Sequence, residues 1–132
     1  MKQEVVVISG ASRGIGAATA RLLAAHGYRL ALLARNKQDL HLLVEQTGLP
    51  KAQFFLVEVD LAQTAGLKAV TEQVLAHFGR IDVLVNNAGI GKFGPIEQIG
   101  LSEVEQLFKV NVLASFALSQ AVLPHFRAKN QG

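Results

Sequence analysis

The sequence predicts an α/β fold built on a doubly wound parallel sheet, and three observations carry this prediction. Short apolar runs rich in β-branched residues alternate with longer runs of helical periodicity. Several helical runs end at a glycine that precedes the next apolar run. The first apolar run leads directly into a glycine-rich turn that opens a helix. Repeated units of this kind join parallel strands through crossover helices.

The first unit consists of a strand and a helix on either side of this turn. Val5-Val6-Val7-Ile8 is typical of a strand buried on both faces. The helix is expected from residue 14 to about residue 26, with Gly27 as its stop. The apolar residues that recur along it at helical spacing are Ile15, Ala18, Leu22 and Ala25.

The next units follow the same scheme. A strand at 28–35 precedes a helix at 37–47 that Gly48 closes, and a strand at 54–60 precedes a helix that Gly79 closes. One face of this latter helix is marked by Leu67, Val70, Val74 and Phe78. Residues 81–85 form the fourth predicted strand.

The last segment predicts one long helix. Ser102 and Glu105 have the spacing of a capping box at its start. The segment is apolar nearly all round, so we expect it to be buried on both sides. Pro124 is expected to bend or end the helix and to leave residues 125–132 as a frayed tail.

Four strands alternating with four helices give a single domain over residues 1–132. We expect the Rossmann-type strand order 3-2-1-4, with helices on both faces. Ligands of such sheets lie beyond the carboxyl ends of the strands. Polar or small residues follow all four predicted strands, at residues 10–16, 35–36, 60–61 and 86–89.

Composition narrows the functional classes. Of the 132 residues, 50% are hydrophobic and 17% charged, which excludes a disordered chain. No uninterrupted apolar run reaches the ~18 residues of a membrane span, and the first residues do not resemble a signal peptide, so we expect a cytoplasmic protein. There is no cysteine, and the four histidines are dispersed, so no metal site is predicted. The net charge of +3 is scattered, which argues against nucleic-acid binding.

The glycine-rich turn predicts a phosphate site. The N-terminus of a helix offers unpaired N–H groups and partial positive charge to an anion. Gly10 would let the chain leave the strand sharply, Gly14 would admit a pyrophosphate to the backbone, and Gly16 would let the helix pack closely on the sheet. The alternative is a purely structural turn, because the spacing G-x-x-x-G-x-G differs from the common dinucleotide fingerprint.

Two arginines favour NADP(H) over NAD(H). Arg35 ends the second strand, where NAD-dependent enzymes usually carry an acid for the ribose 2′-hydroxyl. Arg13 lies inside the glycine turn, within plausible reach of the same 2′-phosphate. The alternative for Arg35 is a solvated residue at a strand end.

These motifs together resemble the short-chain dehydrogenase/reductase family, and specifically its ketoacyl-reductase-like, NADP-preferring group. The resemblance spans the whole chain and implies an oxidoreductase that uses NADP(H). It rests on Ser9-Gly10-Ala11-Ser12-Arg13-Gly14-Ile15-Gly16, Asp60-Leu61, Asn86-Asn87-Ala88-Gly89 and Asn111.

The resemblance assigns a role to each cofactor-binding motif. Residues 10–16, including Ser12, Arg13 and Ile15, would hold the pyrophosphate and the adenosine ribose. Asp60 would receive the adenine amino group beside the backbone of Leu61. The motif Asn87-Ala88-Gly89 would flank the cofactor and tie the fourth strand to its neighbours.

The resemblance also makes Asn111 the asparagine of the catalytic group. Asparagine is unfavourable inside a helix because its amide competes for backbone hydrogen bonds. In the family this residue distorts the helix and anchors a water linked to the catalytic lysine. The alternative is a satisfied or solvated polar residue.

The other catalytic residues of the family are missing. The family requires a serine and Tyr-x-x-x-Lys beyond Asn111, whereas the only tyrosine, Tyr28, starts the second strand. We therefore expect a cofactor-binding half that ends before the fifth strand and is inactive alone. The alternatives are a noncatalytic NADP(H)-binding module or truncated pseudoenzyme acting through a partner, and a scaffold that binds nothing.

Self-association is the remaining expectation. The strand at 81–85 would form an apolar sheet edge, and in the family the last helix belongs to the oligomer interface. We expect a homo-oligomer through one of these surfaces.

Overall fold

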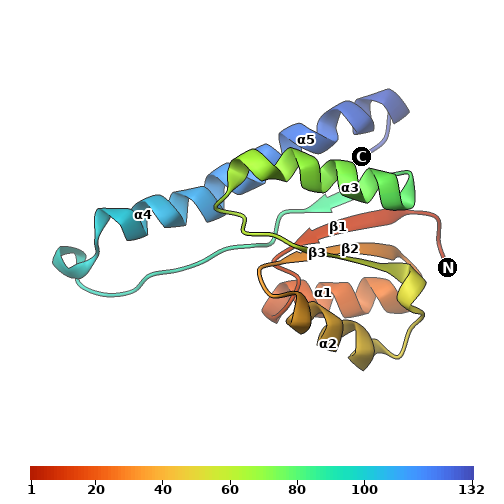
Figure 1. The fold of residues 1–132 in the computed structure, drawn as a ribbon, viewed down its shortest axis with the longest axis horizontal. Helices are drawn as coiled ribbons and strands as arrows, with labels where there is room; N and C mark the ends of the chain where they lie inside the picture. Colours follow the sequence, from red (N-terminus) through yellow and green to blue (C-terminus); the bar gives the residue numbers. More distant parts are fainter.

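A four-stranded sheet in the order β3-β2-β1-β4 forms the centre of the computed structural model, which describes residues 1–132 (Figure 1). All neighbouring strands are parallel. The strands are β1 (Val5–Ser9), β2 (Arg29–Ala34), β3 (Phe54–Glu58) and β4 (Val83–Val85). The Rossmann-type order 3-2-1-4 is confirmed, although the last three strands are shorter than the predicted 28–35, 54–60 and 81–85.

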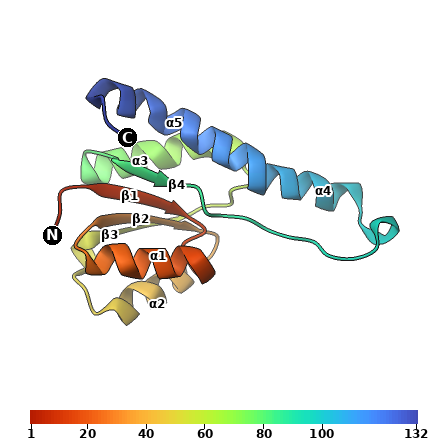
Figure 2. The ribbon, with the colours of Figure 1, turned by 180° about the vertical axis from the view of Figure 1, so that it is seen from behind.

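Helices cover both faces of the sheet, as predicted (Figures 1 and 2). One face carries α1 (Gly14–Ala25) and α2 (Lys37–Thr47), and the other carries α3 (Leu67–Phe78) and α5 (Ala114–Lys129). Successive residues of β1 belong to different cores: Val6 and Ile8 pack with α1 and α2, whereas Val5 and Val7 pack with α3 and α5. The uninterrupted apolar run of β1 therefore fills two cores at once.

Helix α1 faces the sheet with a different side from the one its periodicity indicated. Ile15 and Leu22 are 79% and 60% exposed, and Ala18 and Ala25 are exposed as well. The buried residues are Gly16, Ala17, Ala20 and Ala24. Small residues face the sheet because the glycine turn brings the start of α1 very close to the strand backbone, where larger side chains have no space.

The segment after β4 runs outward and returns as a long helix. Its parts are α4 (Leu101–Phe108), a π-helical turn (Lys109–Leu113) and α5. The predicted capping box of Ser102 and Glu105 is wrong. Gly100 is the N-cap, and its N–H donates to Glu103 Oε2 at 3.0 Å. Gly100 adopts the extended backbone of a cap, so Ser102 lies inside the first turn.

The predicted end of the helix at Pro124 and the frayed tail from residue 125 are wrong, because α5 continues through Pro124 to Lys129. His125 Nε2 accepts a hydrogen bond of 3.1 Å from the N–H of Ile81, which is fully buried. The last turns of α5 are therefore attached to the segment that leads into β4. This long-range contact helps to hold the helical turns beyond Pro124, although proline removes one backbone hydrogen bond.

The long helix is buried on one side only. Val110, Ala114, Leu118 and Val122 are buried, whereas large apolar side chains on the remaining surface are 41–67% exposed: Phe108, Val112, Leu113, Phe116 and Leu123. As one continuous helix, Leu101–Lys129 meets the length and hydropathy of a membrane span, with 22% of its most apolar window buried. Core helices of soluble proteins meet the same criteria.

Candidate functional site

The turn between β1 and α1 has the backbone that its glycines predict. Gly10 and Gly14 adopt φ values of 63° and 57°, in the left-handed region that glycine accepts readily. No atom lies within 4 Å of a Cβ placed on Gly14, so the backbone there is open to a ligand. No side chain caps α1. The N–H groups of its first turn are thus available to an anion.

Gly16 faces the strand rather than the ligand side. A Cβ on Gly16 would collide with the carbonyl oxygen of Gly10 and would lie 2.5 Å from Asn87 Nδ2. The close approach of α1 to β1 therefore requires glycine here. A Cβ on Gly10 would similarly lie 2.8 Å from the Cα of Ala88.

Asn87 and Ser9 join the end of β4 to the turn. Asn87 Nδ2 donates to the carbonyl oxygens of Ser9 at 3.1 Å and Gly10 at 3.0 Å. Ser9 Oγ accepts from the N–H groups of Asn87 and Ala88, each at 3.1 Å. This network holds β4 beside β1 at the edge of the sheet where most of the predicted site residues meet.

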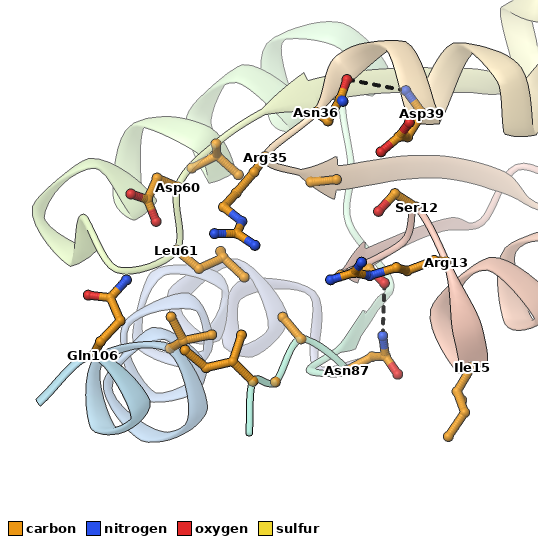
Figure 3. A pocket seen from close by; sticks show the side chains of 17 residues that line it. Ser12, Arg13, Ile15, Arg35, Asn36, Asp39, Asp60, Leu61, Asn87 and Gln106 are labelled. Carbon is orange, nitrogen blue, oxygen red and sulfur yellow. Dashed lines mark hydrogen bonds between the residues drawn. The ribbon is translucent and has the colours of Figure 1, made fainter. Parts of the chain in front are cut away.

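A groove of about 560 Å³ lies at the carboxyl ends of the strands (Figure 3). Ten of the twelve predicted cofactor-binding residues line it: Gly10, Ser12, Arg13, Ile15, Arg35, Asp60, Leu61, Asn87, Ala88 and Gly89. Gly14 and Gly16 do not line it. Residues from four separate strand ends thus converge on one concave surface.

The two arginines lie in this groove without protein partners. In Figure 3, the side chains of Arg13 and Arg35 extend from opposite sides into the same space. Neither takes part in the ion pairs of the structure, which join Arg80 to Asp82 and Lys92 to Glu103. Both guanidinium groups are therefore free to bind a ligand anion.

Asp60 and Leu61 form the far end of the groove, beyond Arg35. Asp60 Oδ1 accepts from the N–H of Ala62 at 3.0 Å, which leaves the other carboxylate oxygen free. Leu61 is buried and contributes an apolar wall. The combination of a free carboxylate oxygen and an apolar wall suits a planar ring that carries an amino group.

Asn111 lies in the π-helical turn, behind the groove wall. Its Nδ2 donates to the Ile90 carbonyl oxygen, and its Oδ1 accepts from the Ile90 N–H, both at 2.8 Å. Ile90 lines the groove, whereas Asn111 does not. The expected helix distortion is present at this residue. In this structure both polar ends of its side chain contact the backbone of Ile90.

An ion pair also attaches the loop before α4 to that helix. Lys92 Nζ lies 2.6 Å from Glu103 Oε1. The hydrogen bond from Lys92, followed by that from the Gly100 N–H, lowers the pKa of Glu103. Glu103 therefore joins both ends of the loop and serves as a first-turn acid rather than as a catalytic acid.

Seven lining residues are not among the predicted cofactor-binding residues: Ala34, Asn36, Asp39, Val59, Ile90, Gln106 and Val110. Of these, Asn36 is one of the polar residues that follow the second predicted strand. Asn36 had a local signal, because asparagine before a helical run predicts an N-cap. Its Oδ1 accepts from the N–H groups of Gln38 and Asp39. Gln106 and Val110 had no such signal, because α4 and the π-helical turn reach the groove only through the tertiary fold.

Tyr28 lies away from the groove. It precedes β2, at the amino end of the strand, and its ring lies 3.9 Å from Lys2 Nζ. No group of three or more His, Cys, Asp or Glu side chains is arranged to hold a metal ion. The acids that line the groove are Asp39 and Asp60.

Comparison with known proteins extends these observations. The family model described as short chain dehydrogenase matches residues 4–132. D-threitol dehydrogenase of Mycolicibacterium smegmatis is 34% identical over 119 residues, which cover 90% of this chain and 46% of that protein. The chain spans about half the length of the curated relatives it matches.

Two solved structures resemble the whole chain. A metagenomic short-chain oxidoreductase in complex with NADP superposes with a TM-score of 0.93 at 38% identity, covering 100% of this chain and 60% of its own. An alcohol dehydrogenase of Thermococcus sibiricus complexed with 5-hydroxy-NADP superposes with a TM-score of 0.85 at 36% identity. That match covers 97% of this chain and 55% of the other.

Proposed function

The chain belongs to the short-chain dehydrogenase family, and we propose that it forms the NADP(H)-binding part of a ketoacyl-reductase-like oxidoreductase. Such an enzyme transfers a hydride between the nicotinamide ring and a carbonyl or alcohol carbon. In this proposal residues 1–132 act as a single cofactor-binding domain. Similarity to structures that contain NADP or 5-hydroxy-NADP supports the choice of cofactor.

One observation carries the proposal: two arginines without ion-pair partners share a groove with an uncapped helix N-terminus. The N–H groups of α1 and the open backbone at Gly14 would hold the pyrophosphate. Arg35 and Arg13 would bind the 2′-phosphate of the adenosine ribose through charge-assisted hydrogen bonds. The bound cofactor would supply the hydride.

The remaining groove residues fit the rest of the nucleotide. Asp60 would accept a hydrogen bond from the adenine amino group, and Leu61 would contact the ring. Asn87, Ala88 and Gly89 would flank the cofactor. Asn111 would support this wall through Ile90 and would take part in catalysis only beside a serine and a Tyr-x-x-x-Lys pair.

A fluorescence titration of the purified chain with NADPH tests the cofactor assignment. Saturable binding is expected, with weaker binding of NADH. Arg35→Asp should weaken NADPH about ten- to a hundredfold, since a charge-assisted hydrogen bond contributes roughly 1.5–3 kcal/mol. Lys51→Asp makes the same charge change outside the groove and should leave binding unaltered. Equal affinity of the unaltered chain for NADH and NADPH would contradict the proposed preference.

We propose further that residues 1–132 alone do not turn over. Tyr28 lies at the amino end of β2, and general acid–base catalysis contributes typically ~10² to 10⁴ in rate. The test is NADPH oxidation in the presence of a ketoacyl thioester or a diketone. Turnover by this chain would overturn the proposal. Binding without turnover is the expected result, and a noncatalytic module would give the same result.

The apolar surface supports a proposal of self-association in the cytoplasm. Five large apolar side chains between Phe108 and Leu123 are exposed on the long helix, and Val83 of the edge strand β4 is 43% exposed. A second copy would cover either surface. Light scattering should give a mass above that of one chain, and a monomer at micromolar concentration would refute this.

A further inference from the structure

We propose that Asp39 sets the cofactor preference of the groove by weakening the binding of a 2′-phosphorylated nucleotide. This inference rests on the proposed NADP(H) site. It concerns a residue that none of the sequence motifs includes. Its premise is that a carboxylate and two guanidinium groups line the same groove.

The position of Asp39 follows from the cap of α2. The N–H of Asp39 donates to Asn36 Oδ1 at 3.4 Å, which places Asp39 in the first turn of the helix. That turn begins just beyond the end of β2, next to Arg35. Figure 3 shows the Asp39 carboxylate on the same side of the groove as Ser12 and Arg13.

The carboxylate of Asp39 has no partner in the protein. It accepts no hydrogen bond, and it belongs to neither of the ion pairs in the structure. Asp60, the other acid of the groove, lies at the opposite end and accepts from Ala62. Asp39 is thus the free negative charge nearest to the glycine turn among the lining residues.

Charge decides the direction of its effect. The four charged lining residues are Arg13, Arg35, Asp39 and Asp60, so the groove has no net formal charge. A 2′-phosphate bound between the arginines would be attracted by them and repelled by Asp39. NADH carries a hydroxyl at this position and would escape this part of the repulsion, whereas any repulsion of the shared pyrophosphate would act on both nucleotides equally. Asp39 would therefore reduce the advantage of NADPH over NADH without abolishing it.

The alternative role of Asp39 is structural, because an acid in the first turn stabilises a helix. This role would not distinguish one nucleotide from another. The comparison between phosphorylated and unphosphorylated ligands therefore separates the two roles. Helix stability can be followed independently by the midpoint of urea unfolding.

The test is to titrate the full chain and its Asp39→Asn variant with NADPH, NADH and 2′,5′-ADP. The variant should bind NADPH and 2′,5′-ADP about three- to tenfold more tightly, and NADH within about twofold of the unaltered chain. The gain should shrink at high salt, because both the ligand and Asp39 are exposed to solvent. Glu45→Gln removes a carboxylate from the same helix outside the groove and should change none of the affinities.

Three outcomes would overturn the inference. They are unchanged NADPH affinity in Asp39→Asn, an equal gain for NADH, and a loss of NADH binding, which would make Asp39 a ribose ligand. Failure of the NADP(H) site itself would look different. Neither the unaltered chain nor any variant would then bind NADPH, and the inference would be rejected together with the proposed site.

Discussion

The side-chain amide of Asn111 is paired with the backbone of Ile90 through two hydrogen bonds of 2.8 Å, one donated and one accepted. The two residues are 21 positions apart, one in a helix and the other in the loop after β4. A polar residue that is unfavourable inside a regular helix is thus used to hold the groove wall. The π-helical turn at Lys109–Leu113 contains this asparagine.

Replacing Asn111 should loosen Ile90. Asn111→Leu removes both hydrogen bonds, and we expect a loss of about 1–2 kcal/mol in the free energy of unfolding, since each bond contributes roughly 0.5–1.5 kcal/mol. Asn111→Asp keeps the acceptor for the Ile90 N–H but turns a carboxylate oxygen toward the Ile90 carbonyl oxygen, so it should lose stability as well while still protecting that N–H. Amide hydrogen exchange at Ile90 is the sharper measurement. It should accelerate in the leucine variant and remain slow in the aspartate variant, and equal rates in both would contradict the pairing.

Alanine at Gly14 and alanine at Gly16 should both lower stability, but for different reasons and with different effects on NADPH binding. Gly16→Ala places a methyl group against the Gly10 carbonyl oxygen, so we expect a loss of stability of about 1–3 kcal/mol from overpacking. Gly14→Ala meets no atom within 4 Å and should cost only about 1–2 kcal/mol, from its left-handed backbone. Its methyl group would obstruct the phosphate, so NADPH affinity should fall most in the Gly14 variant. Urea unfolding and NADPH titration of both variants make the comparison.

The pH dependence of stability should reflect Asp82. This carboxylate accepts from the Val5 N–H at 2.7 Å and pairs with Arg80. Burial raises its pKa, but the hydrogen bonds from Arg80 and Val5 lower it more, so the pKa lies below the ordinary value of 3.8. The stabilisation is therefore present above pH 3.8 and is lost as the pH falls through the folded-state pKa.

Asp82→Asn tests this linkage. The variant should be less stable by about 1–3 kcal/mol at pH 7, because it loses an ionised acceptor. The difference between the two proteins should narrow as the pH falls below 3.8, where the unaltered chain loses its own stabilisation. A gap that stays constant between neutral and acidic pH would show that the charge of Asp82 is irrelevant. Glu72→Gln removes an exposed acid of α3 that belongs to neither ion pair, and it serves as the control.

His125 should anchor the end of α5. His125→Leu would leave the buried N–H of Ile81 without an acceptor, and we expect a loss of about 1–3 kcal/mol. His125→Gln offers a replacement acceptor and should recover part of this loss. Limited proteolysis should cut the leucine variant first within residues 125–132. Equal resistance of both variants would mean that the last turns are held by packing alone.

Local sequence signals predicted the elements that depend on local interactions. The bounds of α2 and the left-handed glycines at its end and at the end of α3 followed from periodicity and stop signals. The parallel direction of the strands followed from the crossovers, and the order 3-2-1-4 followed from the alternation of strands and helices that begins with the glycine turn. Most of the groove followed as well, because parallel strands bring their carboxyl ends to one edge of the sheet.

The errors arose where distant residues decide the outcome. Alanine is only weakly hydrophobic, so the spacing of Ile15 and Leu22 decided which face of α1 was predicted to be buried. In the structure the small residues of α1 face the sheet instead. His125 depends on Ile81, which is 44 positions away, and this contact cannot be found from the proline beside it. Asp39 looks like an ordinary first-turn acid until the glycine turn and β2 are brought together in space.

The contacts between Ser9 and Asn87 also determine when the groove can form. They join residues 78 positions apart, whereas β1, β2 and β3 follow one another along the chain with α1 and α2 between them. Loop closure over such a separation is slow relative to local pairing. During synthesis the first three strands can therefore assemble early, while the glycine turn still lacks Asn87. We therefore expect the glycine turn to acquire its final shape only when β4 docks, so that a nucleotide held there would bind late in folding.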